Sequence, residues 1–277
     1  MFSTVNSALS DLAHWPRWAV MWSLALAIYA ACKWLTWQRS AAPEAPWWKQ
    51  AGYLLAWPGM DAAAFLNGSR AAPAPFGEWL FAAGKLTLGL AMLAVFRCLP
   101  QERPLVVGWA GLLGIVFVLH FGLFHLLSCA WRCVGVNAQP LMDWPIAATS
   151  VSDFWGRRWN RAFRDLTHRF LFRPLTARLG ARGALAAGFL ASGLVHDLVI
   201  SLPAGDGYGG PTLFFVIQAT ALLAERSRVG RAIGLGGGLR GWLFTLLVLL
   251  GPASLLFHAP FVQSVVLPFL RAIGVLP

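Results

Sequence analysis

Long runs of apolar residues alternate with short polar connections along this chain. A transmembrane helix needs about 20 mostly apolar residues, and candidate runs of 14 to 26 residues recur at residues 18–35, 79–96, 105–130, 183–200, 211–224 and 241–257. The runs are continuously apolar, whereas the strands of a membrane barrel alternate in polarity over about ten residues. The pattern therefore predicts an all-α fold, a bundle of about six to eight transmembrane helices in which residues 1–277 form a single membrane-embedded domain.

Composition supports the same conclusion. The 277 residues are 58% hydrophobic and 12% charged, whereas about 25% of the residues in a soluble domain are charged. The first basic residue, Arg17, directly precedes the first apolar run, so the N-terminus lacks the charged region that opens a cleaved signal peptide. We expect a retained first helix and a multi-pass integral protein, placed in a bacterial inner (cytoplasmic) membrane.

The formal net charge of +11 arises in the connections between apolar runs. Eight arginines lie at residues 157–182 and four at 226–240, whereas residues 201–210 contain no Lys or Arg. The positive-inside rule places both arginine-rich segments in the cytoplasm and residues 201–210 outside. Counting the predicted spans from these segments back to the start of the chain places the N-terminus outside. A re-entrant or spanning element at residues 52–66 would change that count. Because topology explains the charge, we expect no nucleic-acid partner.

The connection between residues 131 and 182 is too aromatic for a disordered linker. Ser150-Val151-Ser152-Asp153 resembles a capping box, which predicts a helix from about Val151 to Phe172. Spacings of three and four residues place aromatic and apolar side chains in one stripe and basic side chains in another: Trp155, Trp159, Phe163, Leu166 and Phe170, against Arg157, Arg161, Arg164 and His168. Such an amphipathic helix lies in the membrane interface or serves as an anchor for anionic lipid.

The histidines and cysteines give no spacing typical of metal ligands, so we expect no metal. His120 and His125 are five residues apart, which places them on different faces of a helix. His196 lies deep inside an apolar run, where polar groups are costly and tend to be functional.

Gly188, Ser192 and His196 share one helical face. This face predicts either close helix packing with a hydrogen-bonded histidine or a narrow acyl channel with a general base in its wall. A neutral imidazole can take the proton of an alcohol as its oxygen attacks a thioester, which is typically worth about 10² to 10⁴ in rate. Asp197 is one position further on and points elsewhere, so it is not an obvious orienting partner.

Two ordered motifs carry a resemblance to a known family. Residues 152–160, SDFWGRRWN, resemble the DFWGRRWN motif of wax synthases, a branch of the membrane-bound O-acyltransferases. Residues 192–197, SGLVHD, are similar to the SGLMHE segment of that family, with Asp197 in the place of its Glu. Arg173-Pro174-Leu175 also fits, and the resemblance extends over residues 52–225.

The resemblance implies that His196 is the catalytic base and that Asn160 is the second signature residue. Asn160 would orient the imidazole or donate to the developing oxyanion. The substrate contacts that we expect are Asp153, Trp155, Arg157, Arg158, Trp159 and Ser192. The two arginines would bind the phosphates of coenzyme A or serve topology alone, and the two tryptophans would wall the acyl path or anchor the helix at the interface.

The predicted function is O-acyl transfer from acyl-CoA, a co-substrate, to the hydroxyl of a lipophilic acceptor, in first place a long-chain alcohol. We expect no cofactor, and membrane lipids as further partners. The alternatives are a sterol, glyceride or hydroxylated secondary metabolite as acceptor, or a non-enzymatic transporter or lipid-binding protein in which His196 relays protons. The chain has no HH pair, which excludes the HHxxxDG type of wax ester enzyme.

Overall fold

The computed structural model describes residues 15–40, 44–98 and 102–277, and within these ranges every regular element is helical. Five helical runs are long and apolar enough to cross a membrane: Arg17–Gln38, Phe76–Phe96, Pro104–Cys133, Arg161–Ala204 and Gly238–Leu256. Gly210–Glu225 and Ala259–Ala272 are shorter apolar helices. The chain is therefore an all-α polytopic membrane protein, as its apolar runs predict. Residues 1–14, which would show the predicted orientation of the N-terminus, lie outside the described ranges.

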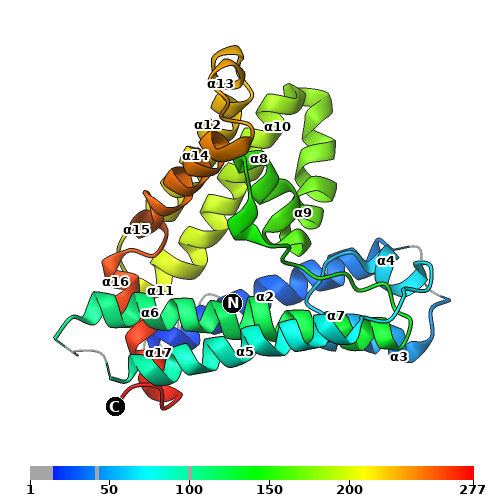
Figure 1. The fold of residues 1–277 in the computed structure, drawn as a ribbon, viewed down its shortest axis with the longest axis horizontal. Helices are drawn as coiled ribbons and strands as arrows, with labels where there is room; N and C mark the ends of the chain where they lie inside the picture. Colours follow the sequence, from blue (N-terminus) through cyan, green and yellow to red (C-terminus); the bar gives the residue numbers. More distant parts are fainter. Residues whose placement is uncertain (1–14, 41–43, 99–101) are drawn as a thin grey trace, which may run out of the picture.

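The first group of helices lies along the lower part of Figure 1. It contains α2 (Arg17–Gln38), α5 (Phe76–Phe96), and a continuous run of α6 (Pro104–Val116), the wide π-helical turn η1 (Phe117–Leu123) and α7 (Phe124–Cys133). Glycines allow α5 to approach that run closely, since a Cβ atom on Gly122 would lie 2.7 Å from the Cα atom of Leu86.

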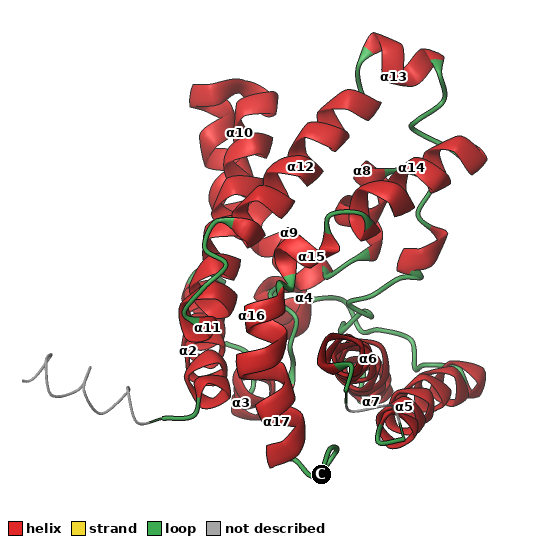
Figure 2. Ribbon diagram, turned by 90° about the vertical axis from the view of Figure 1, so that its left-hand side faces the viewer, coloured by secondary structure: helices red, strands yellow, loops and turns green. Residues whose placement is uncertain are grey.

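The second group contains α10 (Arg173–His196), α12 (Gly210–Glu225) and α14 (Gly238–Leu250), which rise above the first group in Figures 1 and 2. Helices α10 and α12 pack against each other through Gly193, where a Cβ atom would lie 2.6 Å from the Cα atom of Thr212. The C-terminal elements α16 (Ala259–Phe261), η6 (Val262–Val266) and α17 (Leu267–Ala272) pack in a hydrophobic core with α6 and with the region that follows α10.

Helix α10 bends sharply at Gly180, whose φ of 65° lies outside the helical region. The chain turns back there, and the bend lies at the same end of the molecule as α13 (Arg228–Ala232) in Figure 1. Residues 201–210 lie at the opposite end of α12. The part of the arginine-rich segment around the bend thus lies at the same end of the second group as residues 226–240, whereas Arg169 of that segment donates to the Arg39 carbonyl at the end of α2.

The predicted continuous helix from Val151 to Phe172 is wrong. The segment divides into α8 (Val151–Asp153), η3 (Phe154–Arg158), α9 (Arg161–Thr167) and η4 (His168–Phe172), with a break at Trp159 and Asn160. Asn160 adopts φ 40° and ψ 63°, a left-handed conformation that asparagine tolerates and that no α-helix contains. The predicted N-cap is confirmed, because the Ser150 hydroxyl accepts a hydrogen bond from the Asp153 N–H at 2.9 Å.

The aromatic stripe predicted for that helix packs inside the protein. The Trp155 ring contacts Phe189 of α10 and Phe215 of α12, and its indole N–H donates to the Gln218 side chain at 3.3 Å. An interfacial helix would instead turn its aromatic face toward lipid. Trp155 therefore supports the second group of helices from inside the protein.

Residues 47–67 form two short helices, α3 (Trp47–Ala56) and α4 (Ala62–Asn67). At 1.5 Å per residue neither reaches the roughly 30 Å of a bilayer core. The link between them is tied to α2, because the buried Lys33 ammonium donates to the Gly59 carbonyl at 2.7 Å and lies 3.2 Å from the centre of the Tyr53 ring. This region adds no membrane crossing. The remaining short elements are η2 (Pro145–Ala147), η5 (Asp197–Ser201), α11 (Leu202–Ala204) and α15 (Ala253–Leu256).

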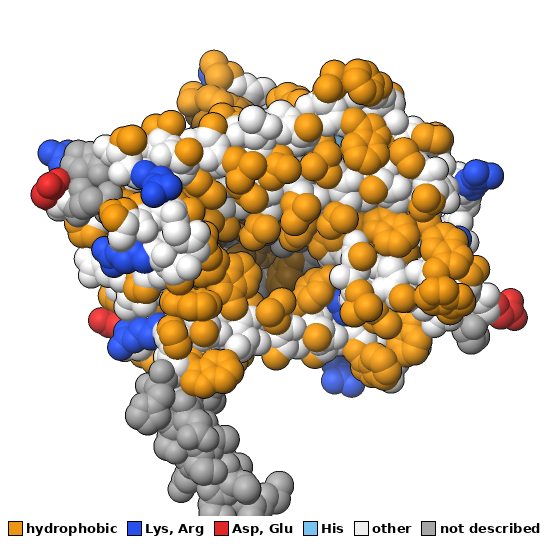
Figure 3. Space-filling view, turned by 90° about the horizontal axis from the view of Figure 1, so that it is seen from below, with side chains coloured by type: hydrophobic (Ala, Val, Ile, Leu, Met, Phe, Trp, Pro, Cys, Tyr) orange, Lys and Arg blue, Asp and Glu red, His pale blue; other side chains and the backbone are white. Residues whose placement is uncertain are grey.

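The surface is hydrophobic over much of its area. Figure 3 shows the underside of the molecule, where hydrophobic side chains surround a hollow near the middle. Large apolar side chains such as Leu55 and Leu247 are exposed. Soluble monomers rarely expose large contiguous apolar patches, so this surface fits contact with lipid.

Candidate functional site

His196 ends the long straight arm of α10. Its Nδ1 lies 2.7 Å from the carbonyl oxygen of Ser192, and its ring lies 4.6 Å from the ring of Phe215. Because a carbonyl oxygen only accepts hydrogen bonds, Nδ1 carries the proton, and in the neutral ring Nε2 keeps an unprotonated lone pair. Within the described residues nothing hydrogen-bonds to Nε2. The geometry therefore gives His196 the tautomer of a general base.

His196 and Asn160 line one cavity of about 340 Å³, which we call the His196 cavity. Its walls are mostly apolar and include Ile28 of α2, Phe124 of α7 and Val195. The two residues that sequence analysis predicted to be catalytic thus meet in the structure, although the break at residues 159–160 and the bend at Gly180 separate them along the chain.

The side-chain oxygen of Asn160 has a structural role, whereas its amide nitrogen does not. Its Oδ1 accepts a hydrogen bond from the Phe163 N–H at 3.2 Å and so caps α9, while its backbone N–H points to the Met142 sulfur at 3.1 Å. Its Nδ2 group has no hydrogen-bond partner within the described part of the chain. Because Ser192 already orients His196, the Asn160 amide N–H is left available to the cavity.

Ser192, an expected substrate contact, is buried, and its hydroxyl donates to the Gly188 carbonyl at 2.9 Å. The hydroxyl is therefore engaged within α10, and the role that the structure shows for Ser192 is to position His196 through its carbonyl. A Cβ atom added to Gly188 would meet nothing within 4 Å. Close packing thus involves Gly193 and not the Gly188 face.

Asp197 points away from His196, as expected, and fixes the start of α12. Its carboxylate accepts hydrogen bonds from the Ser201 hydroxyl at 2.8 Å and from the backbone N–H groups of Gly209 at 2.8 Å and Thr212 at 3.0 Å. The Thr212 hydroxyl also donates to it. Asp197 therefore joins the end of α10 to the beginning of α12.

Asp153 is buried and forms ion pairs with Arg157 and Arg158, the two arginines that were expected to bind phosphate. Arg157 Nη2 lies 2.8 Å and Arg158 Nε 2.6 Å from its two carboxylate oxygens. Burial alone would raise the pKa of Asp153, but the hydrogen bonds and positive charges of the two arginines outweigh burial and lower that pKa below its usual value. Arg158 also donates to the carbonyls of Asp143 and Trp144, so it is a structural group. The Arg157 side chain is 75% exposed.

Trp159 lies within an aromatic cluster. Its ring stacks on Phe154 at 5.6 Å and on His120 at 6.3 Å, with interplanar angles of 12° and 14°. His120 lines the His196 cavity, whereas His125 lines a second cavity. The prediction that the two histidines face different ways is confirmed.

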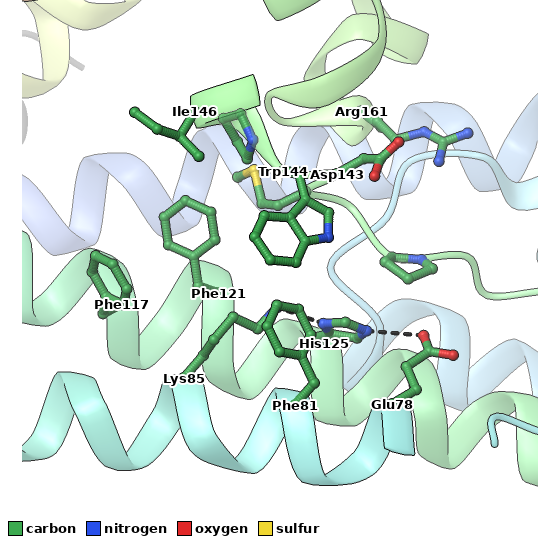
Figure 4. A pocket seen from close by; sticks show the side chains of 13 residues that line it. Glu78, Phe81, Lys85, Phe117, Phe121, His125, Asp143, Trp144, Ile146 and Arg161 are labelled. Atoms are coloured by element: carbon green, nitrogen blue, oxygen red, sulfur yellow. Dashed lines mark hydrogen bonds and ion pairs between the residues drawn. The ribbon is translucent and has the colours of Figure 1, made fainter. Parts of the chain in front are cut away.

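The second cavity has a volume of about 610 Å³ and was not foreseen from the sequence. Figure 4 shows Trp144 above Phe81, with Lys85, His125 and Glu78 at about the level of Phe81. The Lys85 ammonium donates to His125 Nδ1 at 2.7 Å, and His125 Nε2 donates to the Glu78 carboxylate at 2.9 Å. Lys85 lies inside the apolar run 79–96, and that position was the one available signal.

Glu78, His125 and Cys129 place possible metal-ligand atoms within 4.8 Å of one another. Both ring nitrogens of His125 are, however, hydrogen-bonded to Lys85 and Glu78, and Arg132 pairs with Glu78 and contacts the Cys129 sulfur at 3.7 Å. A histidine ligand needs a free lone pair. The cluster therefore fits a hydrogen-bonded polar network better than a metal site.

The Membrane bound O-acyl transferase family model matches residues 138–217, which contain both Asn160 and His196. Relatives match over a longer part of the chain. "Probable long-chain-alcohol O-fatty-acyltransferase 1" of Arabidopsis thaliana is 31% identical over 162 residues, which are 55% of this chain and 47% of the relative. Over residues 138–217 the chain is thus similar to the membrane-bound O-acyltransferases.

Two further relatives carry similar names and match a similar part of the chain. The long-chain-alcohol O-fatty-acyltransferase of Simmondsia chinensis is 28% identical over 138 residues, covering 43% of this chain and 39% of that protein. A further Arabidopsis protein, "Probable long-chain-alcohol O-fatty-acyltransferase 3", is 26% identical over 162 residues, covering 53% and 45%. The chain spans about half the length of these curated relatives or less. These relatives are plant proteins and give no support to the expected bacterial inner membrane.

Proposed function

We propose that the protein transfers a fatty acyl group from acyl-CoA to the hydroxyl of a long-chain alcohol. The observation that carries the proposal is the His196 cavity, in which the free Nε2 of His196 and the free amide N–H of Asn160 line a mostly apolar space. Apolar walls with a few placed polar groups are typical of sites for lipophilic ligands. The names of the plant relatives refer to long-chain alcohols and fatty acyl groups.

His196 acts as the general base in this proposal. Its Nε2 takes the proton of the alcohol as the alcohol oxygen forms a bond to the thioester carbon. The tetrahedral intermediate then loses the coenzyme A sulfur, and the imidazolium returns the proton to that sulfur. The products are an ester and free coenzyme A, and His196 ends in its starting tautomer. A base positioned in this way is typically worth about 10² to 10⁴ in rate.

Asn160 acts on the thioester oxygen. The sequence is compatible with a role in orienting His196 or in stabilising the oxyanion, and the Ser192 carbonyl already performs the first task. The Asn160 Nδ2 group is then free to donate to the oxygen on which negative charge develops, which is the usual function of an oxyanion-hole donor.

Arg157 is the better of the two arginines for binding a coenzyme A phosphate. It is largely exposed and shares Asp153 with Arg158, whereas Arg158 also holds the backbone at residues 143–144. A guanidinium that is exposed on one side can make paired hydrogen bonds to phosphate. This assignment places coenzyme A on the arginine-rich side and the alcohol in the bilayer.

The test uses the purified full-length chain in lipid nanodiscs with radiolabelled palmitoyl-CoA. Hexadecanol, cholesterol and a diacylglycerol are offered separately, and ester and free coenzyme A are both measured. We expect the ester of hexadecanol in preference to the others, and its loss in His196→Ala. Preference for cholesterol or the diacylglycerol would overturn the acceptor. Absence of every ester from folded wild-type protein, or equal ester formation by His196→Ala, would overturn the proposed function.

A further inference from the structure

His120 lies in the wide turn η1 and lines the His196 cavity. Within the described residues neither of its ring nitrogens has a hydrogen-bond partner, and Nδ1 is buried without one. Buried polar side-chain atoms nearly always have a partner, so an unpaired one requires an explanation. A ligand in the cavity would provide that partner.

The ring of His120 is held by aromatic packing. It stacks on Trp159 with an interplanar angle of 14° and meets the edge of Phe124 at 5.2 Å. Trp159 directly precedes Asn160, the residue in the left-handed conformation. The break that presents the Asn160 amide to the cavity therefore also supports the face of His120.

Few other polar side chains line this cavity among the described residues. The Tyr29 hydroxyl donates to the Trp57 carbonyl at 3.0 Å, and Cys32 offers only a weak thiol donor. His196 is already oriented as the base. This leaves His120 and Asn160 as the side chains with free N–H groups in the cavity.

Resting on the function proposed above, we infer that His120 is a second oxyanion donor. In its neutral form it donates a ring N–H to the thioester carbonyl oxygen beside the Asn160 amide, as negative charge collects there during attack by the alcohol. The N–H bond of His120 stays intact, since the proton of the reaction moves only between the alcohol, His196 and the leaving sulfur. Oxyanion sites are commonly built from more than one such donor.

Two competing roles make different predictions. If His120 only fills space in the aromatic cluster, a phenylalanine serves equally well. If His120 is the general base in place of His196, an amide side chain cannot replace it. A hydrogen-bond donor is the one role in which glutamine substitutes for histidine and phenylalanine does not.

The kinetic test compares His120→Phe with His120→Gln in full-length protein in nanodiscs, using palmitoyl-CoA and hexadecanol. Phenylalanine keeps the stacking on Trp159, so folding should be preserved. We expect His120→Phe to lower kcat by about 10², the usual cost of losing one oxyanion donor, with little change in KM. His120→Gln should keep most of the rate, with the acid limb of its pH–rate profile unchanged. Full activity in His120→Phe, or equal loss in both variants, would overturn the assignment.

A binding test separates this inference from the proposed function. Two unreactive palmitoyl-CoA analogues are compared by calorimetry: a ketone, in which CH₂ replaces the sulfur, and a thioether, in which CH₂ replaces the carbonyl. Wild type should prefer the ketone, and His120→Phe should lose about fivefold to tenfold of that preference, the worth of one hydrogen bond. An unchanged preference overturns the role of His120 alone. Wild type that binds neither analogue and forms no ester overturns the proposed function, and the donor role of His120 with it.

Discussion

His196 and Ser192 lie one helical turn apart on α10, and the Nδ1–H of His196 donates to the carbonyl oxygen of Ser192 at 2.7 Å. The backbone of the helix thus performs the orienting task that a carboxylate performs in many histidine-dependent enzymes. Since a main-chain carbonyl cannot be removed by a side-chain substitution, the tautomer of His196 is fixed by the helix itself.

The first prediction concerns His196 and Asn160 as a pair. His196→Ala should lower ester formation by about 10² or more while leaving the detergent-extracted yield near wild type. Asn160→Gly keeps the left-handed backbone and should also lower activity, because the amide donor is lost. The two changes together should cost much less than the product of the single losses, since residues that act as a unit are non-additive. Independent, multiplying losses in a purified double variant would contradict a shared site.

A second prediction compares two glycines of α10. Gly193→Ala places a Cβ atom 2.6 Å from the backbone of Thr212, so α10 and α12 must separate, at a cost of about 1–3 kcal/mol. Gly188→Ala is the matched control, because its Cβ atom meets nothing within 4 Å, and it should be neutral or stabilising by up to about 1 kcal/mol. Thermal denaturation in detergent measures both. Equal midpoints for the two variants would argue against close packing at Gly193.

A third prediction concerns how the stabilisation of the fold by Asp153 depends on pH. The arginines hold the pKa of Asp153 below its usual value, which is about 3.9 in an unfolded chain. A carboxylate of this kind stabilises the fold above the unfolded pKa and loses that contribution as the pH falls through the folded pKa. Asp153→Asn should therefore be less stable than wild type at pH 7, by about 1–3 kcal/mol. The difference should shrink below about pH 4, and a constant gap over a series of pH values would show that charge is not involved.

The fourth prediction separates the two arginines of the signature motif. Arg157→Gln breaks an ion pair whose arginine is mostly exposed and should change stability by less than about 1 kcal/mol. It should raise KM for acyl-CoA while kcat stays constant. Arg158→Gln removes contacts to Asp153 and to two backbone carbonyls, so its thermal midpoint should fall. An unchanged KM in Arg157→Gln would remove Arg157 from the coenzyme A site.

The last prediction tests topology. Gly207 is a poor labelling site, because its φ is 73° and a Cβ atom there would lie 2.5 Å from the His258 ring. Tyr208, which is 63% exposed, is suitable in a background from which the four native cysteines have been removed. Tyr208→Cys should react with a membrane-impermeant maleimide from outside, and a cysteine in place of Val229 from the cytoplasm. The reverse pattern would invert the topology.

The long helices and the helix cap could be predicted because each depends on residues that are close together in the sequence. The apolar runs at 18–35, 79–96, 105–130 and 241–257 each correspond to a long helix, because a bilayer imposes length and hydrophobicity directly on the sequence. The cap at Ser150 and the candidate residues His196 and Asn160 were also found from short motifs. These features require no knowledge of what lies next to them in space.

The parts that were missed depend on contacts across the chain. A stripe of aromatic residues at helical spacing looks the same whether it faces lipid or α10 and α12, so the continuous helix at 151–172 was predicted wrongly. His120 lies as deep in an apolar run as His196, and the argument from depth would have applied to it equally. Lys85 is likewise a charged residue inside an apolar run, and it lines the second cavity. Trp144 and Met142, which also line that cavity, belong to the loop after α7 and are far from Lys85 in sequence.

The π-helical turns have a consequence for insertions and deletions. His120 lies inside η1, and His196 directly precedes η5; each turn holds one residue more than an α-helical turn would. Deleting any one residue of η1 would let an ordinary α-helix form, and the parts of the run before and after it would keep nearly the same relative orientation, because the wide turn absorbs its extra residue. His125 and Arg132 would stay opposite Glu78, but the wide turn that carries His120 would be lost, and with it the placement of the His120 ring. Homologous chains that keep this site should therefore vary in the residue types of η1 far more readily than in its length.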